Sequence, residues 1–330
     1  IGAIMSILFA QNSFLRVGEE ASWGGGFSGS NHQDIKMISS TLQIVQERER
    51  TTHLSVPTSG MQSGTFEGFR NAGGSIDIPA YYDGIGVLIK AALGALATTG
   101  GSAPYTHTYT PAASLPSLSI QFQRGTNLAN SMEDFTGLKV NTMTISAEAG
   151  SEMTISFDLI GKDASARTTN ITSDFPSHDE ILHFEAGSLS LGSSFSPTSL
   201  DIRSFELTLS NAIDRRNLLG SKLTGEPVFT DLREVTMSVT CDVTDNTLYN
   251  ASLAGTQDDV SLQFTRTADT NHHFKMTLSN ATIEDYNDNI TAFGRVERTF
   301  TFRGTANASN AGLTIEIKNG SANGLYGDTP

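Results

Sequence analysis

Two short segments are the candidates for metal binding in this sequence. His178–His183 (HDEILH) has two histidines five residues apart. They would point to opposite faces of a strand and sit poorly on a helix, so one ion would not receive both. Asp285–Asn289 (DYNDN) is similar to a calcium loop, but Ile290 replaces the required glycine and Val296 the closing glutamate. We therefore interpret both segments as polar turns or linker ends, without a metal.

Other residue types that could do chemistry also lack their usual context. Ser190 lies in Gly187–Gly192 (GSLSLG), which alternates like a strand and lacks the spacing of a nucleophile elbow. Gly24–Gly26 could cradle a phosphate, but no lysine and no helical pattern follow. Cys241, the only cysteine, lies in an apolar alternation that predicts a buried, inert thiol. The sequence predicts no catalytic residue, no cofactor and no metal, and therefore not an enzyme.

The composition indicates an acidic chain. Its 330 residues contain 21 Lys and Arg against 35 Asp and Glu, a formal charge of −14. Because this negative charge repels phosphates, such a chain is poorly suited to binding nucleic acid. No segment approaches the roughly 20 apolar residues of a membrane-spanning helix, so we expect no membrane contact. Ile1–Ala10 is apolar but lacks a basic start, and we interpret it as an N-terminal strand.

One strand pattern recurs later in the chain. In Leu115–Gly125 (LPSLSIQFQRG) apolar and polar residues alternate, with a proline before and a glycine after them. Val260–Thr267 (VSLQFTRT) repeats the pattern 142 residues later. Further repeated pairs are Gly74–Tyr82 with Val235–Val243, Asp83–Gly94 with Asp245–Gly255, and Glu152–Gly161 with Arg295–Gly304. Because the spacing changes only in connecting segments, we predict one β-rich unit used twice.

The predicted fold is all-β with short flanking helices, arranged as two tandem β-sandwich or barrel domains. The first copy spans residues 1–168 and the second 180–304, with a linker at 169–179. Residues 305–330 form a C-terminal extension that we assign to neither copy. Gly94–Leu115 has no counterpart in the second copy, and we expect a surface extension there.

An ordered series of segments resembles the tail tube proteins of long-tailed bacteriophages. The opening Gly18–Gly24 (GEEASWG) is followed by GSIDIP, DGIGVLIKAALG, YTHTYTP, LPSLSIQFQRG and FTGLKVNTMTIS. The resemblance covers about Met5–Gly161 well, and the second copy as a diverged echo. The sequence departs from the family where a threonine is expected after Trp23-Gly24 and Gly25 stands instead.

The resemblance implies a structural virion protein of the phage tail. Such proteins form rings whose inner sheets join into a barrel, and the rings stack into a tube for DNA. Some relatives carry two fused tube folds, and three chains then give a pseudo-sixfold ring, which the duplication fits. The implied partners are other copies of the chain and the terminator, tape measure and distal tail proteins, with assembly in the host cytoplasm and transient passage of DNA.

Four carboxylates on strands that flank the expected ring-forming sheet are candidates for the channel wall: Asp77, Glu148, Asp158 and Glu284. An acidic, Ser- and Thr-rich wall would repel phosphates and leave DNA free to pass. Alternation alone does not say which face of a strand is inside, so each could equally face the outer solvent.

Two long connections, Ser55–Gly73 and Asn217–Leu232, hold the same place in each copy. Because they exceed simple turns, we expect them to reach along the tube axis and contact the next ring. The residues singled out in these loops are Ser55, Pro57, Gly60, Gly64, Gly220, Gly225 and Pro227.

A surface-binding or decoration β-sandwich of a virion or cell is the alternative to a tube subunit. A sugar-binding face would need several exposed aromatic side chains, and Trp23 is the only tryptophan. A decoration module also has no need of the duplicated strand–helix–strand order.

Overall fold

The computed structural model describes residues 13–27, 31–50, 64–125, 132–176, 180–195, 200–242, 245–267, 269, 271–290, 296–308 and 310–327, with only the backbone of 288–290. Strands dominate this part of the chain, which confirms the all-β prediction. Its helical elements are α1 (Gly86–Leu93), α2 (Thr247–Ala254) and the short η1 (Phe184–Ala186). The expected N-terminal strand Ile1–Ala10 lies outside the described residues.

The first half of the chain forms two layers that share the long strand β9 (Met132–Glu148). One layer contains, in spatial order, β2 (Gln33–Lys36), β1 (Phe14–Glu19), β8 (Leu118–Gln123), the first part of β9 and β11 (Asp163–Arg167). The other contains β3 (Ser39–Ser40) and β4 (Gln43–Arg50), then β5 (Thr65–Pro79), β10 (Thr154–Gly161) and the second part of β9. Gly137, at φ +67°, marks the point where β9 passes between the layers.

The second half repeats this arrangement around the long strand β18 (His273–Ile290). One layer contains, in order, β12 (Gly187–Leu191), β17 (Gln257–Thr265), the first part of β18, β20 (Leu313–Asn319), β7 (Tyr105–Pro111) and β6 (Gly94–Thr99). The other contains β13 (Asp201–Ser210), β16 (Glu234–Asp242), β19 (Val296–Arg303) and the second part of β18.

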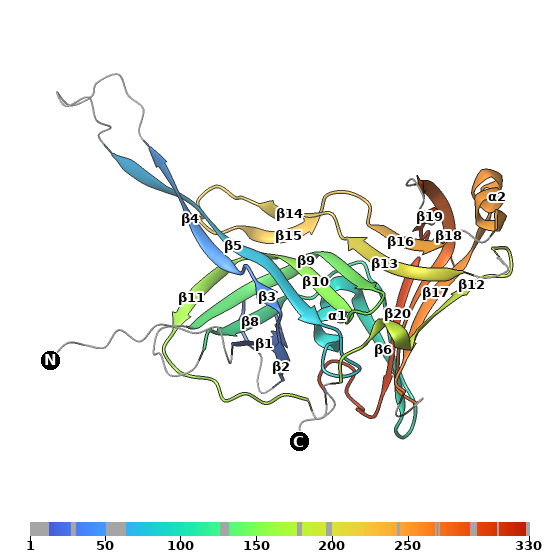
Figure 1. The fold of residues 1–330 in the computed structure, drawn as a ribbon. Coiled ribbons are helices and arrows are strands. Elements are labelled where there is room, and N and C mark those ends of the chain that lie inside the picture. Colours follow the sequence, from blue (N-terminus) through green and yellow to red (C-terminus); the bar gives the residue numbers. More distant parts are fainter. Residues whose placement is uncertain are drawn as a thin grey trace.

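Strands β9 and β13 join the two halves. They pair antiparallel from Ser204 opposite Glu148 to Ser210 opposite Thr142. The result is one sheet that runs β4–β5–β10–β9–β13–β16–β19–β18 through the molecule (Figure 1). We call it the continuous sheet.

Two expectations about the smaller segments were wrong. Gly94–Leu115 is not a surface extension, because β6 and β7 form a hairpin whose Tyr109 is buried in the core. The C-terminal extension is not separate from the copies either, since β20 lies between β18 and β7 and so ties the two halves together. The β20–β7 pairing joins strands about 200 residues apart, which a local sequence pattern does not reveal.

Both expected long loops contain described residues that belong to paired strands. Residues 65–73 belong to β5, which pairs with β4, and β15 (Gly225–Phe229) pairs with β14 (Ile213–Arg216). We call β4–β5 and β14–β15 the two arms; the first extends far from the body of the molecule (Figure 1). Ser55, Pro57 and Gly60 lie outside the described residues, and Gly64 directly precedes β5. Gly220 lies in the β14–β15 turn, and Gly225 and Pro227 lie on β15.

Helix α1 lies where the two halves meet and is buried along nearly its whole length. Asn211, just after β13, donates from its side-chain amide to the carbonyl oxygens of Ala92 in α1 and Val140 in β9, at 2.9 and 3.0 Å. The helix, the sheet junction and the second half are therefore fixed to one another by buried hydrogen bonds.

Candidate functional site

The continuous sheet has one apolar and one polar face, because side chains alternate along each strand. Phe157, Ile145, Leu207 and Phe300 are buried on the apolar face. The residues between them are mostly Ser and Thr, and their hydroxyls pair across strands, as in Thr240 with Thr299 at 2.9 Å. The polar face therefore satisfies many of its own hydrogen bonds and offers few basic groups.

The four predicted wall carboxylates lie on this polar face, spread over β5, β10, β9 and β18. Asp77 accepts a hydrogen bond from the Ser156 hydroxyl at 2.6 Å. Glu148 and Asp158 are exposed, and alternation puts them on the same side as Thr144 and Ser156. Glu284 reaches this face through an ion pair with Arg303 at 2.5 Å.

Sequence reasoning missed other carboxylates of the same face. Glu206 on β13 lies opposite Ser146 of β9 and Ser238 of β16, beside a hollow that Glu148 and Glu152 also line. The alternation of β13 was sufficient to find it, but the pairing of β13 with β9 was not predictable from local pattern. The polar face is thus more acidic at the junction of the two halves than the sequence indicated.

The two arms come from different halves and contact each other. The Arg70 backbone N–H of β5 donates to the Lys222 carbonyl oxygen at 2.8 Å, and the Lys222 ammonium pairs with the Glu67 carboxylate. Arg215 of β14 donates to the Ala72 carbonyl oxygen at 2.8 Å, and burial lowers the pKa of its guanidinium. The arms therefore form one composite projection.

This projection exposes large apolar side chains without a described cover. Among the described residues, the strongly exposed ones on or next to the arms are Val45, Phe66, Leu218, Leu219, Val228 and Leu232. Clustered exposed apolar residues on a folded chain mark interaction surfaces. The arms thus have the chemistry of a contact surface.

We compared the sequence of the chain with models of known protein families. The phage tail tube protein family matches the chain over residues 10–324, which includes both halves and the whole continuous sheet. The chain belongs to this family. No curated protein matches it. The chain is therefore a structural component of the phage tail, and its extended polar sheet and arms are read as surfaces of a tube subunit.

The segment Gly18–Gly24 of the tail tube chain is a structural site centred on Glu20, a buried carboxylate. Its oxygens accept hydrogen bonds, at 2.7 to 3.2 Å, from the backbone N–H groups of Gly24, Gly26 and Gly137 and the hydroxyls of Ser117 and Ser119. Trp23 donates from its ring to the Gly137 carbonyl oxygen at 3.1 Å, and Lys162 lies over its ring. The glycine run therefore encloses a carboxylate of the chain itself.

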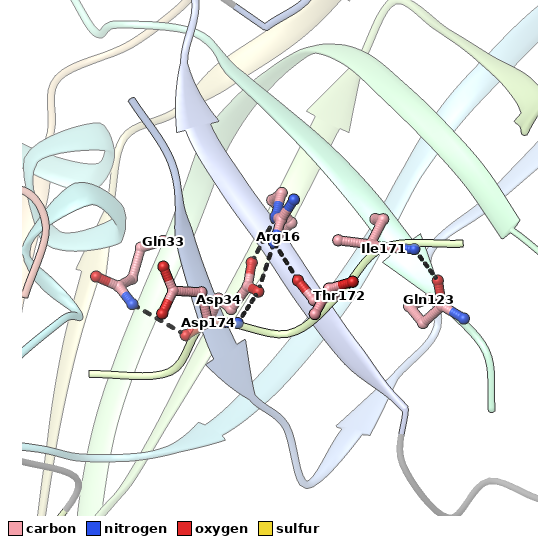
Figure 2. Close-up of polar contacts among 7 residues, drawn as sticks. All are labelled: Arg16, Gln33, Asp34, Gln123, Ile171, Thr172 and Asp174. Atoms are coloured by element: carbon pink, nitrogen blue, oxygen red, sulfur yellow. Dashed lines mark hydrogen bonds and ion pairs between the residues drawn. The ribbon is translucent and has the colours of Figure 1, made fainter. Parts of the chain in front are cut away.

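A strap after β11, residues 168–176, crosses the outer strands of the first half (Figure 2). Asp34 of β2 is fully buried and accepts from Arg16 Nε and Nη2 at 2.7 and 2.8 Å. It also accepts from the Asp174 backbone N–H at 2.7 Å, and Arg16 donates to the Thr172 carbonyl oxygen. The predicted linker is thus held in place, and no local pattern had pointed to Arg16 or Asp34.

Substituting Asp34→Asn should release the strap. The substitution removes the charge that holds Arg16 and weakens the bond to Asp174, and the loss of about 2 kcal/mol corresponds to roughly 30-fold more frequent opening. Trypsin cleavage after Arg167 under native conditions should accelerate accordingly. Asp174→Asn is the matched control, because Asp174 contributes its backbone N–H and should keep it. Equal cleavage of both variants would contradict this role of Asp34.

The described residues contain no cluster of three or more His, Cys, Asp and Glu that could hold a metal ion. Asp285 and Asn287 lie on β18, opposite Thr301 and Thr299 of β19, and form no loop. Ser190 lies on β12, opposite Ser261. Within the described part of the chain, no helix is long and apolar enough to span a membrane.

Proposed function

We propose that three copies of this chain form a closed ring with pseudo-sixfold symmetry, and that the rings stack into the tail tube around the path of the DNA. The observation that carries this proposal is the continuous sheet, in which two equivalent sets of strands are joined edge to edge by β9 and β13. A sheet of this kind leaves an edge at each end, and ring closure is a physical means of pairing both edges.

The polar face of the continuous sheet is the proposed channel wall. Its carboxylates, Asp77, Glu148, Asp158 and Glu284 among them, would repel phosphates. Its hydroxyls carry no charge, and those that pair with one another, such as Thr240 with Thr299, would add little binding. The arms would then lie at the rim and contact the adjacent ring. The remaining partners would be the terminator, tape measure and distal tail proteins, met during assembly in the host cytoplasm.

Electron microscopy of the purified chain tests this proposal. Stacked rings or hollow tubes, with three chains per ring, are the expected result. Six whole chains in each ring, or one half of the chain outside the tube wall, would overturn the pseudo-sixfold arrangement. Isolated monomers decorating another particle would support a surface module in its place.

Reversing charge on the proposed wall should impede DNA. Glu148→Lys and Asp158→Lys together replace exposed carboxylates by cations that attract phosphates, so DNA release from virions should slow at low salt and recover as salt screens the charges. Asp174→Lys, exposed on the strap that crosses the other layer of the first half, is the control and should leave release unchanged. Normal release at low salt from the double variant would mean that these carboxylates do not face the passage.

A further inference from the structure

The two halves share irregularities that allow their residues to be matched one by one. Gly137 in β9 and Asn280 in β18 both have positive φ, at +67° and +48°, and lie 143 residues apart. Each strand then has a register shift against its neighbour at equivalent places, beside Asn141 and beside Glu284. Because bulges and left-handed residues are specific backbone features, β9 and β18 correspond with a spacing of 143.

The first strands of the two halves correspond in the same way. Ser39 lies opposite Asp77 in the first half, and Ser204 lies opposite Thr240 in the second. Matching β5 to β16 through their partners β10 and β19 makes Asp77 and Thr240 equivalent. Residues 39–45 therefore correspond to 204–210.

The internal junction between the halves has a definite register. Thr208 lies opposite Thr144, with both side chains on the polar face. Asn211 donates from its backbone N–H to the Asn141 carbonyl oxygen, and Ala149 donates to that of Arg203, both at 2.8 Å. These bonds fall on alternate pairs, so Thr208 and Thr144 form a non-hydrogen-bonded pair, where side chains are closest.

The two ends of the continuous sheet are the counterparts of this junction. Among the described residues, no strand pairs with the edge of β4 away from β5, or with the edge of residues 283–290 away from β19. The β3–β4 end exposes Ile38 and Val45, at 52% and 45%. The β3–β4 end corresponds to β13, and the β18 end corresponds to β9. Strands β13 and β9 pair with each other inside the chain.

Helices α1 and α2 differ in whether a neighbouring half covers them. Helix α1 is covered by the second half, and Ala92 is fully buried at the Asn211 contact. Helix α2 packs on β18 through Tyr249 against Tyr286, yet Leu253, which corresponds to Ala92, is 67% exposed. Helix α2 thus has the position of α1 without the neighbour that covers it.

We propose that the β3–β4 end of one chain pairs with the β18 end of a second chain in the register of the internal junction, with α2 packed beside it. This proposal rests on the proposed function and specifies its contact. Gln43 then lies opposite Asn287, and Val45 opposite Asp285. The Asn141 side chain accepts from the Ile213 backbone N–H at 3.1 Å in the internal junction; the corresponding residues between chains are Glu284 and Arg48, which have opposite charges.

Cysteine cross-linking of assembled protein tests this register. In Gln43→Cys with Asn287→Cys, the two thiols should form a disulfide, because a non-hydrogen-bonded pair places Cβ atoms within its reach. Burial raises the pKa of Cys241, the only native thiol, to about 11, which keeps it out of the exchange. Under mild oxidation, non-reducing gels should show a covalent circle of three chains of 35.2 kDa each.

Two matched variants separate the outcomes. Thr144→Cys with Thr208→Cys should cross-link within one chain, and Gln43→Cys with Asp285→Cys, displaced by one diagonal step, should link at least tenfold less. Tubes that form normally but give no interchain link, or link both interchain pairs equally, would overturn the register and leave the tube function standing. Absence of rings and tubes from the unmodified chain would overturn the proposed function and this pairing together.

Discussion

Replacing Glu20 with glutamine is expected to lower the free energy of unfolding by about 3–5 kcal/mol, since a buried carboxylate with several donors loses its charge and an acceptor. A glutamine has the same shape, but in either orientation its amide nitrogen would face a backbone N–H that can only donate, that of Gly24 on one side or those of Gly26 and Gly137 on the other. Ser117 and Ser119 could turn their hydroxyls, whereas the backbone donors are fixed. Urea or guanidinium unfolding measures the change.

The neighbouring Glu19→Gln is the matched control. Glu19 pairs with Lys90 at 2.8 Å, and both side chains are partly exposed. Such a pair contributes about 1 kcal/mol or less, so the control should remain near the parent stability. If both glutamine variants unfold alike, Glu20 does not organise the turn at Gly24–Gly26 as its contacts indicate.

The sequence was sufficient to predict the strands that alternate strongly. Leu118–Gln123 and Gln257–Thr265 are strands in equivalent places, as their shared pattern indicated. The hairpin β6–β7 and the strand β20 were misassigned because β7 and β20, which pair with each other, lie about 200 residues apart in the chain. Strand-like residues in the β5 arm were read as a loop, since Gly68, Gly73 and Gly74 interrupt the alternation.

The candidate surfaces were also predictable only in part from the sequence. Period-two alternation alone relates Asp77 to Ser75 and Asp158 to Ser156, and the pairing of β5 with β10 then brings them to one face. Local pattern could not show that the arms of the two halves would touch through Arg70 and Lys222. Local pattern also could not identify Asp34 and Glu20, because the groups that donate hydrogen bonds to them come from distant segments of the chain.

Substituting Leu219→Asp should leave rings intact and abolish their stacking. Leu219 is fully exposed in the turn of the β14–β15 arm, where its loss costs the folded chain little. Burying a leucine in a contact gives about 2 kcal/mol, and three chains per ring would multiply this to about 6 kcal/mol, roughly a 10⁴-fold change in ring association. Tube length by electron microscopy and sedimentation of rings measure the effect.

Leu219→Met is the matched control, which tests whether stacking needs an apolar side chain at this position or only an unchanged turn. Methionine keeps the volume and apolar character of leucine, so this variant should stack into tubes of normal length. The arms join through Lys222 and Glu67, which neither substitution touches, so the composite projection should persist in both variants. Normal tubes from the aspartate variant would show that the exposed apolar residues of the arm serve another partner. The contact between rings would then have to come from the body of the sheet, because a projection that tolerates a buried charge at its tip cannot be an apolar interface.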